Sequence, residues 1–188
     1  MVSENSQSIE RVLDDYEHQA QIYWEFMTAE ERCQWAYLAG IIDGEGSITI
    51  SLQRRTGRPN DFQLRLAVKM MHEITIRSLK SIAGVGRARK DKYGSRTLGK
   101  DVWEWVAVDR NAASVIRHCM LFLITKREQA RVALAFHELQ AYPRRRAHPL
   151  SPSNREKRKL FYTEMGKLNK KGPGKRKVIE EDGNGIRT

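Results

Sequence analysis

Two carboxylates stand two residues apart at the end of an apolar stretch, in the sequence Asp43-Gly44-Glu45-Gly46. Residues 35–42 before them have the length of a short helix, and the two glycines should end it because they remove helix propensity. A helix dipole disfavours negative charge at the carboxyl end. A divalent cation such as Mg²⁺, which prefers carboxylate and carbonyl oxygens, would compensate that charge. A glycine-rich turn with solvated acids is the alternative that these residues leave open.

The charge of the chain favours a nucleic-acid partner. Its 188 residues include 34 Lys and Arg against 23 Asp and Glu, a formal net charge of +11, and such an excess is typical of proteins that bind polyanions. Residues 1–34 carry 8 acids and 2 bases, residues 35–142 carry 10 and 18, and residues 143–188 carry 5 and 14. We therefore expect an acidic, helical amino-terminal arm, one domain over 35–142, and a basic tail over 143–188.

The basic tail contains a short helix near 154–168, between a linker over 143–149 and a segment from 170 onward that should be unstructured. It either contacts the nucleic-acid backbone through its bases or serves as a solubilising appendage.

Several classes of protein are excluded by composition. No apolar run has the length of about 18 residues that a transmembrane helix needs, so we expect no membrane partner. The acidic amino terminus lacks the features of a secretory or transit peptide. Two cysteines, Cys33 and Cys119, exclude a disulfide scaffold and a four-cysteine zinc site. We expect an intracellular protein, in the cytoplasm or in an organelle.

Alternating residues predict two antiparallel strands after the first helix. The apolar members of the two runs are Ile48, Ile50, Leu52, Leu64, Leu66, Val68 and Met70. A short helix ending at Gly84, a second hairpin over 87–90 and 102–108, and helices to about 120 and over about 125–142 follow. The capping-box spacing at Thr125 opens the last of these. This order is α+β: an antiparallel sheet with helices on one face and the other face uncovered.

The uncovered face of that sheet is polar and almost free of acids. Ser, Thr, Gln, Arg and Lys side chains can read the donors and acceptors of the DNA major groove, and only Asp61 is acidic between residues 47 and 69. An ordinary solvated face is the alternative, although such a face usually mixes both signs. The candidate nucleic-acid-binding residues are Ser47, Thr49, Ser51, Gln53, Arg55, Gln63, Arg65 and Lys69, with Arg87 and Arg89 from the second hairpin.

The nine residues Leu38-Ala39-Gly40-Ile41-Ile42-Asp43-Gly44-Glu45-Gly46 closely resemble the signature of the LAGLIDADG homing endonucleases, with identity at six positions. The resemblance continues through the hairpin, Gly84-Val85-Gly86 and residues 122–130. It implies an αββαββα domain whose antiparallel sheet forms a saddle. It also implies a metal-dependent endonuclease that hydrolyses double-stranded DNA with Mg²⁺ or another divalent cation such as Mn²⁺, and an intron-encoded gene.

The resemblance also assigns roles to single residues. Glu45 and the carbonyl of Gly44 would bind the metal, and Asp43 would hydrogen-bond the turn. His72 would orient or deprotonate the attacking water; capping the next helix is its alternative role. Lys126 would face the scissile phosphate, and a simple exposed charge is the alternative. A cation in the first turn of a helix opposes the dipole, so Lys126 needs an anion to meet.

A single copy of the motif makes one chain half of a symmetric site. The resemblance implies that two motif helices pack against each other, with a dimer interface formed by Leu38, Ala39, Gly40 and Ile42. A homodimer would act on a long, nearly palindromic site and cut both strands. Two alternatives stay open: a DNA- or RNA-binding protein of this fold without cleavage, such as a splicing maturase or regulator, and a small protein-interaction domain with a basic surface.

Overall fold

The computed structural model describes residues 18, 20–54, 61–141 and 152–170. A helical segment over residues 20–26 comes first. The elements that follow are α2 (Ala29–Glu45), β1 (Gly46–Gln53), β2 (Asp61–Met70), α3 (Glu73–Ala83), β3 (Arg87–Lys90), α4 (Lys92–Leu98), β4 (Trp103–Val108), α5 (Asp109–Cys119), α6 (Arg127–Ala141) and α7 (Pro152–Leu168). None of the helices in these ranges is both long and apolar enough to cross a membrane.

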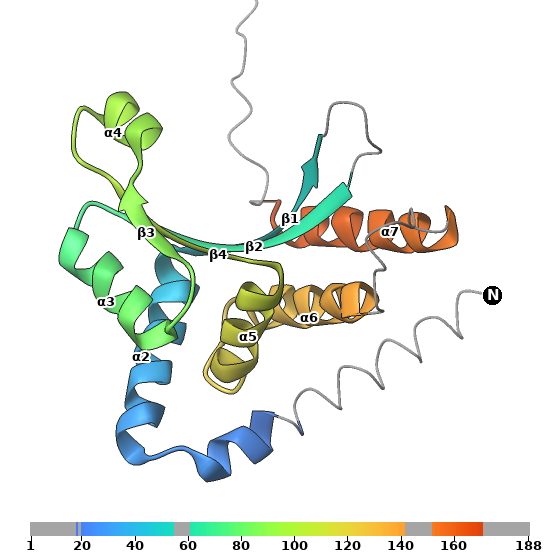
Figure 1. The fold of residues 1–188 in the computed structure, drawn as a ribbon, viewed down its shortest axis with the longest axis horizontal. Coiled ribbons are helices and arrows are strands. Elements are labelled where there is room, and N and C mark those ends of the chain that lie inside the picture. Colours follow the sequence, from blue (N-terminus) through green and yellow to red (C-terminus); the bar gives the residue numbers. More distant parts are fainter. Residues whose placement is uncertain (1–17, 19, 55–60, 142–151, 171–188) are drawn as a thin grey trace, which may run out of the picture.

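Four antiparallel strands form one sheet in the order β1-β2-β4-β3. Thr49 pairs with Arg65, and Glu104 pairs with both Lys69 and Arg89. Since side chains alternate across a strand, these residues share one face of the sheet. Helices α2, α3, α5 and α6 cover the other face (Figure 1). The predicted α+β fold, with its αββαββα order and one uncovered sheet face, is confirmed.

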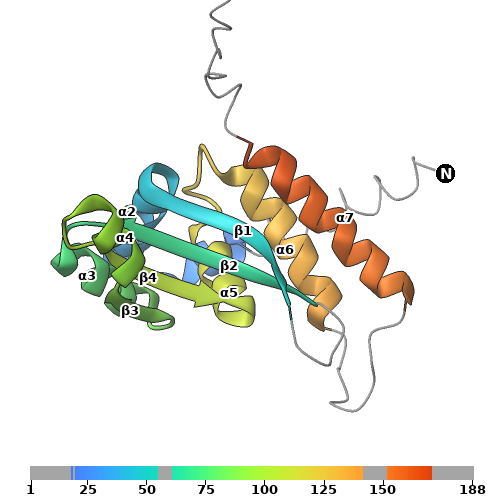
Figure 2. The same ribbon diagram turned by 90° about the horizontal axis from the view of Figure 1, so that it is seen from above.

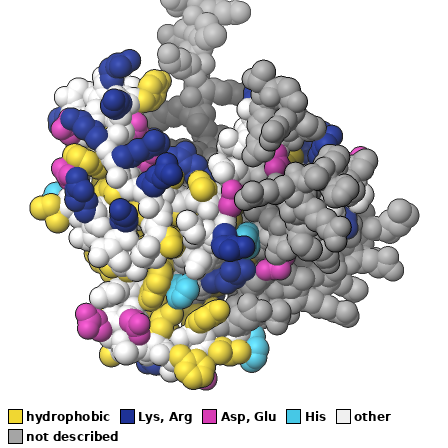
Figure 3. Space-filling model, viewed as in Figure 1, with side chains coloured by type: hydrophobic (Ala, Val, Ile, Leu, Met, Phe, Trp, Pro, Cys, Tyr) yellow, Lys and Arg dark blue, Asp and Glu magenta, His cyan; other side chains and the backbone are white. Residues whose placement is uncertain are grey.

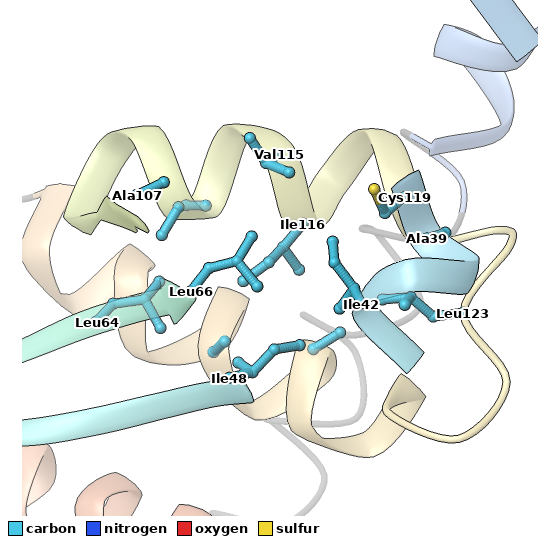
Figure 4. Packing of buried hydrophobic residues seen from close by; sticks show 14 of the residues in the cluster. Ala39, Ile42, Ile48, Leu64, Leu66, Ala107, Val115, Ile116, Cys119 and Leu123 are labelled. Carbon is cyan, nitrogen blue, oxygen red and sulfur yellow. The ribbon is translucent and has the colours of Figure 1, made fainter. Parts of the chain in front are cut away.

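The core lies between the sheet and the helices beneath it. Ile42 of α2, Leu66 of β2 and Ile116 of α5 are fully buried and meet there (Figure 4). Trp105 of β4 is also fully buried, and its indole Nε1–H donates to the Val85 carbonyl at 3.0 Å. This satisfied donor allows a large aromatic side chain to fill the core without a desolvation cost.

Helix α2 extends beyond the predicted 35–42 at both ends. It begins after Thr28, whose side chain and that of Glu31 form a capping box, so the predicted boundary at residue 34 lies inside the helix. At the other end it continues through Gly44 to Glu45, and the Gly46 N–H donates to the Ile42 carbonyl. A Cβ at residue 46 would lie 2.6 Å from that carbonyl oxygen, so glycine is required there.

The second hairpin contains a helix where the sequence predicted only a loop. Asp91 caps α4 by accepting from the Tyr93 N–H at 3.1 Å, and Gly99 ends the helix in the left-handed region with φ 64°. This helix lies on the uncovered side of the sheet, opposite α3 (Figure 1).

Helix α7, in the predicted tail, packs against the domain and lies beside the edge strand β1 (Figure 2). Its Arg158 side chain is 1% exposed; the guanidinium pairs with Asp61, donates to the Phe62 carbonyl at 2.6 Å and lies over the Phe136 ring. The Asn169 amide, just beyond α7, donates to the Ile48 carbonyl at 2.9 Å. The described part of the tail is therefore integrated into the fold.

Replacing Arg158 by Ala should destabilise the whole domain, because it leaves the Asp61 carboxylate without its buried partner. Losing one member of a buried ion pair costs about 3–5 kcal/mol. Urea unfolding followed by circular dichroism measures the effect, and Lys159→Ala, on the exposed side of α7, is the matched control with a change below about 0.5 kcal/mol. Equal stability of the two variants would contradict a structural role for α7.

Candidate nucleic-acid interface and metal site

The Asp43 carboxylate joins the end of α2 to a turn more than 80 residues away in sequence. It accepts hydrogen bonds from the backbone N–H groups of Ile124 at 2.7 Å, Thr125 at 3.2 Å and Lys126 at 2.9 Å. In return, the Lys126 ammonium donates to the Asp43 carbonyl. These bonds replace the predicted capping box at Thr125, which is why α6 begins only at Arg127.

Lys126 meets its negative partner at the carboxyl end of α2. The last carbonyls of a helix have no partner within it and carry partial negative charge. The ammonium therefore stabilises α2 while it sits before the first turn of α6, and its dipole cost there is offset. An ammonium has three donors, so two stay available beyond the bond to Asp43.

Glu45 is the last residue of α2, and both it and Gly44 are exposed. The Gly44 carbonyl is one of the last four of the helix, and these carbonyls accept no hydrogen bond from within the helix. A carboxylate and a carbonyl oxygen are hard donors that suit Mg²⁺. In the described ranges no three His, Cys, Asp or Glu side chains lie close enough to hold a metal together. One chain thus offers part of a coordination shell, to be completed by water, phosphate oxygens or a second chain.

His72 lies at the same end of the sheet as Glu45. The register pairs Gly46 with Val68, so the end of β2 runs beside the start of β1. His72 occupies the N-cap position of α3 without bonding the helix backbone through its side chain. Its Nδ1 is instead 2.8 Å from the Thr75 hydroxyl, and the residue is exposed. The ring is thus oriented by Thr75 and accessible to solvent.

The polar face of the sheet brings most of the predicted readers together. The hydroxyls of Ser47, Thr49 and Ser51 each donate to a carbonyl of β2 at 3.4 Å. The remaining described members of the set share this face by register: Gln53, Gln63, Arg65, Lys69, Arg87 and Arg89. Arg55 lies outside the described residues.

A buried acid organises the bases of this face. Glu104 is 2% exposed; it pairs with Arg65, lies 3.5 Å from the Lys69 ammonium and 3.2 Å from the Arg89 guanidinium. The sequence analysis missed Glu104, although strand parity places it opposite Trp103 and Trp105 and so on the polar face. Three cations around one anion leave this part of the sheet positive but with fixed side chains.

A second ion pair ties Lys69 to the segment before α4. The Lys69 ammonium lies 2.7 Å from the Asp91 carboxylate. This hydrogen bond holds the pKa of Asp91 below its ordinary value and raises that of Lys69 above its own, so both side chains stay charged around neutral pH. Lys and Arg side chains gather on this part of the surface, over α4 and the neighbouring strands (Figure 3).

The predicted dimer-interface residues do not share one surface. Leu38, Ala39 and Ile42 are fully buried in the core of this chain, so the prediction that they contact a second copy is wrong for these three. Helix periodicity turns them toward the sheet and turns Gly40 outward. Gly40 is exposed, and a Cβ built on it or on Gly44 meets nothing within 4 Å.

The described part of the acidic arm packs on the helical side of the molecule. The Tyr23 ring lies 5.3 Å from that of His118 in α5, and the Trp24 ring lies 5.3 Å from that of Phe122. Arg32 donates to the Trp24 carbonyl at 3.0 Å. Residues 20–28 thus leave the polar face of the sheet open (Figure 1).

Solved structures resemble this architecture, whereas no protein-family model and no curated protein matches the chain. The homing endonuclease I-CvuI in complex with its target aligns with a TM-score of 0.65 and 20% identity, over 80% of this chain and 90% of that one. The archaeal intron-encoded homing endonuclease I-Vdi141I, complexed with DNA, gives 0.61 and 16%, over 76% and 87%. The LAGLIDADG homing endonuclease I-SmaMI bound to cleaved DNA gives 0.57 and 16%, over 72% and 44%. The chain therefore has the LAGLIDADG homing endonuclease fold, which is the fold of a DNA endonuclease.

Replacing Glu104 by Gln should destabilise the domain by about 1–3 kcal/mol, because three cations then face one another around a neutral amide. The loss should shrink at high salt, which screens their repulsion. Urea unfolding at low and high KCl measures it. Asp101→Asn is the control, since it removes an exposed pair with Lys90 that is worth less than about 1 kcal/mol. A loss no larger than in this control would contradict the role of Glu104.

Proposed function

We propose that the chain is a divalent-metal-dependent, site-specific DNA endonuclease that works as a homodimer on a nearly palindromic site. The observation that carries the proposal is the end of the motif helix, where an exposed Glu45 lies beside an anchored turn and next to the basic face of the sheet. The acid proposed to bind the metal thus lies at the helix end, and the bases proposed to contact DNA lie along the strands.

The residues at this end divide the work of hydrolysis. Glu45 and the Gly44 carbonyl hold the cation, which when bound polarises the phosphate and makes water a better nucleophile. His72, held by Thr75, orients that water or takes its proton, since a neutral imidazole nitrogen is a proton acceptor. Lys126 keeps one donor on the Asp43 carbonyl and directs another to the phosphate.

The polar face supplies the grip on DNA. Two antiparallel strands fit the major groove, where Arg pairs with guanine and Gln with adenine. Arg65 and Arg89 are held by Glu104, so little side-chain freedom is lost when they meet a base. The short side chains of Ser47, Thr49 and Ser51 on β1 supply hydroxyl groups for further contacts with the DNA.

Two chains are needed because one chain carries one motif. A symmetric dimer with α2 at its axis places one Glu45 at each scissile phosphate. The exposed Gly40 and Gly44, four residues apart on one side of α2, let two helix backbones approach closely. The lengths of the solved structures support this. The chain matches 87–90% of I-Vdi141I and I-CvuI but 44% of I-SmaMI, so it is about as long as the first two proteins and much shorter than the third.

Replacing Glu45 by Gln should abolish cleavage and preserve DNA binding, because the amide keeps the shape but loses the charge that holds the cation. The substrate is a supercoiled plasmid that carries the two DNA segments flanking the gene, joined as they would be without it. Conversion to the linear form with Mg²⁺ or Mn²⁺ is followed by gel electrophoresis, and gel shift without a divalent cation measures binding.

The matched control is Glu25→Gln, the same change at an exposed position of the arm, which should cut like the unaltered chain. Equal cutting by Glu45→Gln would remove Glu45 from the chemistry. An unaltered chain that binds the plasmid but never cuts it would instead identify a DNA- or RNA-binding protein of the same fold.

Replacing Gly40 by Leu should convert the dimer into a monomer without unfolding it. The side chain has open space in one chain but separates two closely packed helix backbones. Gly166→Leu in α7 is the matched control, because Gly166 is also a helical glycine with nothing within 4 Å of an added Cβ. Analytical ultracentrifugation distinguishes the two, and an unchanged mass for Gly40→Leu would contradict the α2 interface.

A further inference from the structure

We propose that α4 is a separate DNA-contacting element, which binds the sugar–phosphate backbone beside the segment that lies on the sheet. This inference rests on the proposed function, because it assumes that duplex DNA lies on the polar face. It concerns a helix inserted within the second hairpin, between β3 and β4.

Its place in the fold is the first argument. Helices α2, α3, α5 and α6 cover one face of the sheet, whereas α4 stands on the polar side, at one end of that face (Figure 1). A duplex lying on the polar face would therefore contact α4 at one end of that face. In the view from above, α4 lies at the end of the molecule opposite α7 (Figure 2).

Hydrogen bonds and an ion pair hold α4 against the sheet. Asp91 accepts from the Tyr93 N–H at 3.1 Å and pairs with Lys69 of the polar face at 2.7 Å. The Ser95 hydroxyl accepts from the Val102 N–H at 2.8 Å, which ties the middle of α4 to the start of β4. A Cβ on Gly94 would lie 2.9 Å from the Asp91 carboxylate, so glycine lets the acid come close. An element held to the sheet at two points, through Asp91 and through Ser95, is positioned for binding before the ligand arrives.

Its outer surface has the chemistry of a phosphate-binding element. Lys92 and Arg96 are one helical turn apart and exposed, and Lys100 follows just after the helix. Among the described residues, none of the ion pairs involves these three cations, and α4 itself contains no acid. Tyr93 follows Lys92 in the helix with 79% of its surface exposed, a large ring that can pack on a deoxyribose.

A polyanion explains this surface better than a protein partner does. Three neighbouring cations without a paired acid repel one another, and a dense anionic ligand offsets that repulsion. Duplex DNA carries one charge per about 1.7 Å of its axis, and each neutralised phosphate releases condensed counterions. We therefore assign Lys92 and Arg96 to phosphates and Tyr93 to a sugar.

The double substitution Lys92→Ala/Arg96→Ala tests the assignment. Fluorescence anisotropy of a labelled duplex of about 40 base pairs of mixed sequence is measured at several KCl concentrations without divalent cations, so that no cleavage occurs. The slope of log K against log salt should become shallower by about one for each lost phosphate contact, hence by about two per subunit. Tyr93→Ala should weaken binding severalfold and leave the slope unchanged.

The matched control is Lys80→Ala/Arg110→Ala, which removes the same charge from exposed positions of α3 and α5, below the sheet. It should keep the slope of the unaltered chain. Equal slopes for the two double variants, both with the circular dichroism of the folded protein, would overturn the role of α4 and leave the proposed function standing. A flat salt response of the unaltered chain would overturn both.

Discussion

The structure depends on Asp43, an acidic residue whose side chain has a structural role. Its carboxylate accepts hydrogen bonds from three backbone N–H groups of the turn over residues 124–126, and bonds to a charged acceptor are stronger than those between neutral groups. The turn is thereby fixed against the end of α2, and the Lys126 side chain lies next to the motif. Because Asp43 is engaged in this way, the exposed Glu45 is the acid of the motif that can take a ligand.

The polar face follows a related rule, with one acid placed among bases. Glu104 lowers the positive potential of the sheet and so weakens attraction to any DNA, yet it holds Arg65 and Arg89 in place. Fixed side chains lose less entropy on binding a matching base and fit a wrong one poorly. Such an arrangement trades general affinity for discrimination, as the proposed site-specific activity requires. The helix α4 adds attraction at the end of the face, where discrimination is not needed.

Alternation within the strands was enough to predict the two hairpins and most of the polar face, because residues two apart always share a side. What the sequence could not supply was contact between distant segments. The link from Arg158 to Asp61 spans 97 residues, and nothing near Arg158 marks it as buried. Helix α4 is seven residues long and forms only because Asp91 caps it and Lys69 anchors that cap. The nine-residue motif identified α2, but its resemblance does not say which side of α2 faces the core.

The side of α2 that faces away from the core is marked by two glycines. A glycine inside a helix costs about 1 kcal/mol relative to alanine, and α2 contains Gly40 and Gly44 four residues apart on a surface where an added Cβ meets nothing. A lone chain gains no packing from either glycine and would be more stable with alanine at both positions. The cost is offset only if another backbone comes close enough to exclude a Cβ. A second α2 related by a two-fold axis would satisfy this condition and bring the two Glu45 side chains near each other, so the same glycines that weaken the helix favour the proposed dimer.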